Sequence, residues 1–246
     1  MKRDDISAET ALYRKKFFLS LIVPCTFVFL LWLVKICEML FEADLSFLGI
    51  YPLKLKGLPG IFLSPLIHEN FKHLISNSIP LLLLGTGLFY FYSDVALKVS
   101  GWIYFLTGLF VWLAARDAWH IGASGLVYGL ASFLFFSGII RKYFRLVALS
   151  LLVVFLYGSM IWGMVPELYT NVSWESHILG FVAGIIMAIV YRKQGPQNPI
   201  IDWMQPDYVE PELEDEGEIL RQAQDDGEEE NEEDKRQKAK DTSQEL

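Results

Sequence analysis

Cysteine is scarce in this sequence, with Cys25 and Cys37 the only two among 246 residues. Both lie in one apolar block, twelve residues apart. If the block is helical, this separation is roughly 18 Å at 1.5 Å per residue. A disulfide requires Cα atoms within roughly 7 Å of each other. We therefore expect two unpaired thiols in an apolar helix and no disulfide within the chain.

Charged side chains are also scarce over long stretches, and 53% of all residues are apolar. The apolar residues fall into six blocks: Phe17–Ile36, Leu74–Tyr92, Val99–Ala115, Gly122–Ile140, Phe144–Met164 and His177–Tyr191. A spanning helix needs roughly 20 residues, and burial within a bundle or local bilayer thinning accommodates shorter ones. This pattern predicts an all-α, multi-pass integral membrane protein built as a six-transmembrane-helix bundle.

A cleavable signal peptide is not evident, because Met1–Glu9 is polar and the first apolar block is long enough to span by itself. Lysine and arginine cluster before the first block, between the fourth and fifth, and after the sixth. Positive loops face the cytoplasm, so both termini are predicted to lie there. Blocks two, four and six then begin at the outer surface.

Apolar residues become sparse after Gln194, and charged runs such as Asp225–Glu230 take their place. Such a segment cannot bury enough apolar surface to fold. We expect a membrane domain over residues 1–193 and a disordered acidic cytoplasmic tail over 194–246. The tail is read as solvated, with a basic cytoplasmic partner as the less favoured alternative.

The loop between the first two blocks is rich in apolar residues but is broken by Gly57, Pro59, Gly60 and Pro65. An apolar connector of this kind is expected to lie in the membrane–water interface rather than in water.

Polar residues within membrane spans are costly, which makes them functional candidates. The second block opens with His68, His73 and Asn77, the fourth with Ser124, and the sixth with His177. The predicted topology places all of these residues at one depth, just below the outer surface.

Small-residue pairs favour close contact between the fourth and sixth blocks. Gly125 and Gly129 form one such pair, and Gly180 and Gly184 form another. Their packing would bring Ser124 within reach of His177, whose imidazole can take the serine proton. His73, Asn77 and the backbone N–H of Ser124 are the candidate donors to the resulting oxyanion.

The motif Gly122-Ala123-Ser124-Gly125, with Tyr128 one turn later, resembles the nucleophile motif of the rhomboid intramembrane serine proteases. The segment from His177 through Gly180 to Gly184 resembles their histidine span, and His68–Asn77 resembles the span that lines their oxyanion hole. The likeness covers roughly residues 17–192.

This resemblance implies a serine endopeptidase with a Ser–His dyad and no third acid, which cuts single-span membrane substrates near the outer surface. It implies that Tyr128 stacks on His177, with Gly122, Gly180, Gly184 and His68 in supporting roles. It also implies that the fifth span and the 163–176 loop gate the site, in a bacterial cytoplasmic membrane. The Trp-Arg pair that many members carry in the first outer loop does not occur between Phe41 and Asn70.

Three other functions fit parts of this pattern. A zinc protease is disfavoured because His68-Glu69 is followed by His73, five residues on rather than four, which on one helix places the two rings about 140° apart. A transporter would carry charges deep in several spans, whereas Lys35 and Glu38 lie at an edge. A non-catalytic rhomboid-like protein that binds membrane helices remains the alternative. His68 is expected to have a hydrogen-bonding or surface role, and no cofactor, metal ion or nucleic acid is expected.

Overall fold

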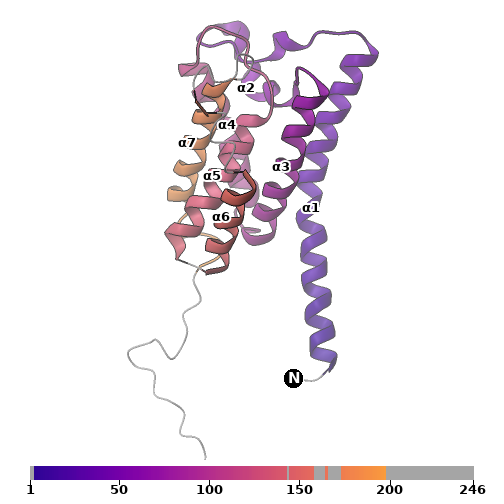
Figure 1. Cartoon of the computed structure of the whole chain (residues 1–246), viewed down its shortest axis with the longest axis vertical. Coiled ribbons are helices and arrows are strands. Elements are labelled where there is room, and N and C mark those ends of the chain that lie inside the picture. The colour runs from indigo at the N-terminus through magenta and orange to yellow at the C-terminus, as the bar shows by residue number, and fades with distance from the viewer. Residues whose placement is uncertain (1–2, 143, 158–163, 166–172, 198–246) are drawn as a thin grey trace, which may run out of the picture. The chain divides into compact units, whose positions relative to one another are not determined.

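The computed structural model describes residues 3–142, 144–157, 164–165 and 173–197, whose regular structure is entirely helical (Figure 1). Six longer helices coincide with the six apolar blocks: α1 (Arg3–Leu40), α3 (Phe71–Phe91), α4 (Ala96–Ala114), α5 (Ser124–Arg141), α6 (Phe144–Tyr157) and α7 (Trp174–Val190). Between α1 and α3 lie four short turns: η1 (Ser46–Leu48), η2 (Leu55–Gly57), α2 (Gly60–Leu63) and η3 (Ser64–Leu66). The prediction of an all-α protein is confirmed.

Among the described residues, four helical segments are long and apolar enough to cross a bilayer: Thr10–Leu40 of α1, and the whole of α3, α4 and α5. The helix α7 has 17 residues, and α6 has 14 described residues. These lengths fall below the roughly 20 residues of a typical span. The four long apolar segments indicate an integral membrane protein, and the count of six spans stays a prediction. Of the predicted tail, residues 198–246 lie outside the described part of the chain.

Helix ends follow local sequence rules. The side chain of Asn70 caps α3 by accepting a hydrogen bond of 2.9 Å from the backbone N–H of His73. Ser173 caps α7 in the same way by accepting from the N–H of Ser176. Asparagine and serine are preferred at this position because their oxygens satisfy N–H groups that lack a partner within the helix. These caps fix where the chain enters α3 and α7, which both carry site residues.

The helix α5 is the most deeply buried of the four long apolar segments, and it packs against α7, α6, α3 and α4. Its apolar side chains form the centre of the core: Leu126, Val127, Leu130, Phe133 and Leu134. By contrast, α1 packs mainly on α3 and leaves large side chains such as Phe18 and Phe29 exposed. Exposed apolar surface of this extent is expected where lipid, not water, surrounds a helix.

The loop between α1 and α3 contains short helical turns at residues expected to break regular structure, because Gly60 begins the helix α2 and Pro65 lies within η3. Backbone hydrogen bonds tie this loop to α4 and to the α4–α5 loop: Ile50 with His120 in both directions, Leu53 to Trp112, and Gly122 to Ser64. Side chains such as Leu55, at 83% exposure, remain on its surface. These backbone contacts hold the loop in a chain that lacks a Trp-Arg pair.

Lys35 ties α1 to the start of α3. Its ammonium group lies 2.8 Å from a carboxylate oxygen of Glu38 and donates to the carbonyl oxygens of His68 at 2.8 Å and Glu69 at 3.1 Å. The ion pair of Lys35 and Glu38 near the end of α1 is therefore hydrogen-bonded to the loop that precedes α3.

Arg141, at the end of α5, is buried rather than exposed as a cytoplasmic surface charge. Its guanidinium group donates to the side chain of Ser137 and to the carbonyl oxygens of Tyr191, Gln194 and Pro196. A buried charge is tolerated when its donors are satisfied in this way. Arg141 thus fastens the end of α5 to the end of α7.

Candidate active site

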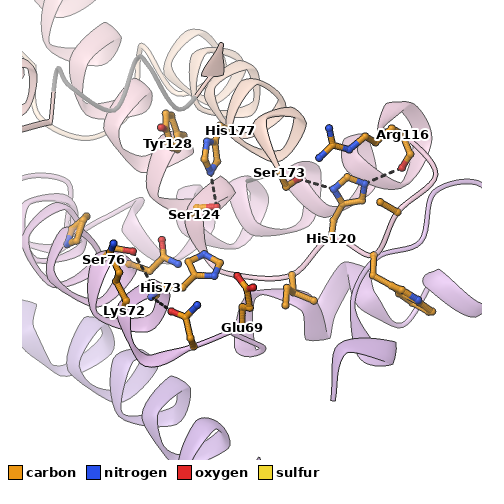
Figure 2. Close-up of a pocket in the computed structure, with 16 residues that line it drawn as sticks. Glu69, Lys72, His73, Ser76, Arg116, His120, Ser124, Tyr128, Ser173 and His177 are labelled. Carbon is orange, nitrogen blue, oxygen red and sulfur yellow. Dashed lines mark hydrogen bonds between the residues drawn. The ribbon is translucent and has the colours of Figure 1, made fainter. Parts of the chain in front are cut away.

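A cavity of about 860 Å³ opens where the beginnings of α3, α5 and α7 meet (Figure 2). Its wall comes from these three helix starts and from the α4–α5 loop. The lining is unusually polar for a bundle of apolar helices and includes His73, Asn77, Ser124 and His177. Three segments that are far apart in the sequence therefore contribute to one site, as their shared depth predicted.

Ser124 is the first residue of α5, and the backbone before it turns sharply at Gly122, whose φ is +103°. Few residues other than glycine adopt this conformation. A Cβ atom at Gly122 would also lie 2.6 Å from a ring carbon of His73. Glycine at this position therefore lets the chain reverse beside the imidazole of His73 and deliver Ser124 into the cavity.

His177 lies in the first turn of α7, and its Nε2 is 2.8 Å from the hydroxyl oxygen of Ser124 (Figure 2). The ring of Tyr128 stacks on the imidazole with centroids 4.2 Å apart and planes 15° from parallel. Both rings are largely buried, with 7% of His177 and 6% of Tyr128 exposed. The stacked ring restricts the imidazole, so that one nitrogen faces the serine.

The close approach of α5 and α7 depends on glycine. A Cβ atom at Gly180 would overlap the carbonyl oxygen of Gly125, and one at Gly184 would overlap the carbonyl oxygen of Gly129. The two small-residue pairs therefore face each other, backbone against backbone, as expected for such motifs. This contact sets the distance between the helices that carry Ser124 and His177.

The candidate oxyanion donors belong to residues that line the same cavity. Asn77 is buried, and within the described part of the chain its amide nitrogen has no hydrogen-bond partner. The backbone N–H of Ser124 is at a helix start, where it has no acceptor within the helix. His73 lines the same cavity and packs against Gly122. Asn77, His73 and Ser124 therefore all line one cavity.

His68 differs from expectation. It precedes α3 rather than belonging to it, and only 1% of it is exposed, so a surface role is wrong. Its ring contacts that of His73 at 5.1 Å between centroids, which a shared helix would have prevented. Burial, reinforced by the nearby His73, lowers the pKa of His68 to about 4, which keeps the imidazole neutral. Within the described residues, no three metal-binding side chains gather at one place.

Several residues at the cavity mouth were missed by the sequence reasoning. His120, from the α4–α5 loop, is 2% exposed and bonds to Ser173 at the start of α7. Arg116 of the same loop lies 3.3 Å from the buried carboxylate of Glu175. The sequence offers one clue to the contact between His120 and Ser173. His120 precedes Ser124 by four residues, and Ser173 precedes His177 by the same number. Most of the predicted 163–176 gate lies outside the described residues.

Comparison with known families identifies the chain. The family model of the Rhomboid domain matches residues 57–194, which include every segment that lines the cavity. This chain belongs to the rhomboid family. An uncharacterised protein from Mycobacterium tuberculosis is 40% identical over 187 residues, covering 70% of this chain and 75% of the relative. A second uncharacterised relative, from Mycobacterium leprae, is 32% identical over 182 residues, and the match covers 70% of this chain and 71% of the relative.

The predicted rhomboid resemblance is therefore confirmed. Rhomboid proteins are a family of intramembrane proteases, and membership agrees with the four long apolar helical segments of this chain. The relatives' descriptions assign no activity to them. The chemistry of this rhomboid protein has to be argued from its own site.

Proposed function

We propose that this protein is an intramembrane serine endopeptidase in which Ser124 is the nucleophile and His177 the general base. The observation that carries the proposal is the 2.8 Å contact between His177 Nε2 and the Ser124 hydroxyl, inside a polar cavity of the bundle. A nucleophile and its base must lie within hydrogen-bond reach, and a contact of 2.6–3.2 Å is the usual range.

The first half of the reaction forms an acyl-enzyme. The hydroxyl of Ser124 donates to Nε2 of neutral His177, and its oxygen attacks the scissile carbonyl carbon while the proton passes to the imidazole. The protonated imidazole then gives this proton to the leaving amine. A water molecule, activated by the same imidazole, hydrolyses the ester and restores the Ser124 hydroxyl.

The negative charge on the carbonyl oxygen requires donors that are already in place. Asn77 supports this role because it is buried beside the cavity and its amide N–H groups are not engaged by described residues. The backbone N–H of Ser124 adds a donor at the positive end of α5. His73 is assigned as the third donor through its place in the same wall.

The membrane arrangement is part of the proposal. Six spans with both termini in the cytoplasm place the beginnings of α3, α5 and α7 on the outer side, where the cavity opens. The distribution of lysine and arginine supports this orientation. Single-span membrane proteins are the proposed substrates, cut near the outer interface of the bacterial cytoplasmic membrane. The acidic tail over 194–246 then lies in the cytoplasm.

The decisive experiment measures cleavage of a single-span test substrate by the full chain in proteoliposomes, together with covalent labelling of Ser124 by a fluorophosphonate. Labelling joins the serine oxygen to phosphorus and releases fluoride, so it reports nucleophilicity without helix docking. We expect both activities in the wild type and neither in Ser124→Ala or His177→Ala. Asp117→Ala is the control, because Asp117 is an exposed loop residue.

A folded wild-type protein that binds the test helix but neither cleaves it nor reacts with the fluorophosphonate would contradict the proposal. That result would favour the non-catalytic rhomboid-like alternative.

A further inference from the structure

His120 joins the two segments that carry Ser124 and His177. It lies on the α4–α5 loop, where its backbone pairs with Ile50 through hydrogen bonds of 2.8 and 2.9 Å. Its side chain reaches away from this bridge toward α7, as Figure 2 shows. Nδ1 lies 2.6 Å from the hydroxyl of Ser173, and Nε2 lies 3.0 Å from the carbonyl oxygen of Arg116.

The partners of His120 define its tautomer. The carbonyl oxygen of Arg116 can only accept, so Nε2 carries the proton and Nδ1 accepts from the Ser173 hydroxyl. The Ser173 oxygen then accepts from the hydroxyl of Ser176 at 2.6 Å and from its backbone N–H at 3.4 Å. The hydrogen bonds therefore run in one direction, from Ser176 through Ser173 to neutral His120.

The chain of hydrogen bonds ends directly beside the proposed base. Ser176 precedes His177, and its carbonyl oxygen lies 2.9 Å from where a Cβ atom of Gly125 would be. Any rotation of the first turn of α7 would therefore alter both this tight contact and the direction of the His177 imidazole. Such movement matters because a misplacement of about 1 Å can cost about 100-fold in rate.

We propose that His120 is a positioning residue which, through Ser173 and Ser176, holds the first turn of α7 so that His177 stays against Ser124. This inference rests on the proposed protease function. His120 does not touch the reacting atoms, and its effect is on the orientation of the base. Arg116 and Glu175, 3.3 Å apart, tie the same two segments a second time.

Protonation of His120 would disturb this arrangement. An imidazolium donates from both nitrogens, so the Ser173 hydroxyl would have to accept from Nδ1 and donate to Ser176 instead, which reverses the direction of the hydrogen bonds. Burial lowers the pKa of His120, although its bond to the Arg116 carbonyl and the charge of Glu175 oppose the shift. The positive charge of Arg116 also lowers this pKa. Ile50, which pairs with the His120 backbone, is apolar and adds no charge near the imidazole. The neutral form is therefore present at neutral pH and is lost as the pH falls through the lowered pKa.

The test compares His120→Phe, Ser173→Ala, their double variant and Ser173→Thr, each as the full chain in proteoliposomes. The measurements are the rate of Ser124 labelling by the fluorophosphonate, kcat and KM for the test substrate, and thermal unfolding. Asp117→Ala serves as the control from the same loop. Ser173→Thr keeps the hydroxyl and a favoured helix cap.

We expect His120→Phe and Ser173→Ala to lower kcat and the labelling rate by about 10- to 100-fold, with little change in KM. The double variant should be no slower than the slower single variant, because both remove one chain of contacts. Ser173→Thr should stay near the wild-type rate. In the wild type the rate should fall more steeply with acid than in His120→Phe, since two imidazoles rather than one must stay neutral.

Wild-type rates and an unchanged pH profile in folded His120→Phe would overturn the inference. Multiplying losses in the double variant would equally overturn the His120–Ser173 link, and Ser173→Ala keeps the test valid if His120→Phe does not fold. In each of these outcomes the wild type is active, so the protease proposal stands. A folded wild type that is inert toward the fluorophosphonate would remove the proposal and the inference together.

Discussion

The ring of Tyr128 on α5 stacks on the imidazole of His177 on α7, with the ring centroids 4.2 Å apart. A soluble serine protease often orients its histidine with a buried carboxylate. Here an aromatic face occupies one side of the imidazole, and the acid closest in sequence, Glu175, pairs with Arg116.

This stack predicts a graded response at Tyr128. Tyr128→Phe retains the ring and should keep most of the activity, whereas Tyr128→Leu should lower kcat by about 2- to 10-fold, the equivalent of a lost aromatic pair of about 0.5–1.5 kcal/mol. Steady-state kinetics on both variants provides the measurement. Equal activity in Leu and Phe variants would show that the stack does not orient the base.

Asn77→Ala should lower kcat and leave KM nearly unchanged, because the amide donates to a charge that exists only in the transition state. Losing one oxyanion donor costs about 100- to 1000-fold in a soluble serine protease. We expect a smaller loss here, since His73 and the Ser124 N–H remain. A change in KM alone would make Asn77 a substrate-binding residue.

The acid-free dyad is tested at Glu175. Glu175→Gln removes the charge that faces the half-exposed Arg116 and should lower the thermal unfolding temperature only slightly, since a partly exposed ion pair contributes about 0–1 kcal/mol. Catalysis should stay within about tenfold of wild type, or about 1.4 kcal/mol in the barrier. His177→Ala sets the inactive baseline, and a folded Glu175→Gln variant at that baseline would turn the dyad into a triad.

Gly180→Ala should separate α5 from α7 and abolish cleavage, because its methyl group would overlap the Gly125 carbonyl. Overpacking of this kind typically costs about 1–3 kcal/mol of stability. Gly101→Ala is the matched control, since a Cβ atom there has no neighbour within 4 Å. Activity and thermal unfolding of the two variants should differ sharply, and similar behaviour would argue against a backbone contact.

Topology is tested with single cysteines in a background that lacks Cys25 and Cys37. A cysteine at Ser46 should react with an impermeant thiol reagent added outside, and one at Ser93 should not. Ser46 lies in the loop before α3, and Ser93 follows α3 at its other end. The reverse labelling pattern would place the cavity on the cytoplasmic side.

The sequence predicts the helices and the convergence of Ser124 with His177 well, because glycines four residues apart report directly on backbone proximity. It fails at His68, which lies three residues before the first residue of α3, Phe71, so helical angles do not apply to it. It misses His120 because the partner Ser173 is 53 residues away and the Ile50 bridge sets the loop's path. It counts the lysines and arginines between the fourth and fifth blocks only as a topology signal, because the burial of Arg141 against the end of α7 is a tertiary effect.

The glycine contact between α5 and α7 also affects the conformational entropy lost on folding. Glycine has no side-chain rotamers, so pressing Gly180 onto Gly125 orders two helices without freezing any side chain. The separation of the two helices is therefore set by the main chain, while the side chains of Tyr128 and of the His120–Ser173 pair orient the imidazole. Core substitutions away from these side chains can accumulate while α5 and α7 keep their spacing.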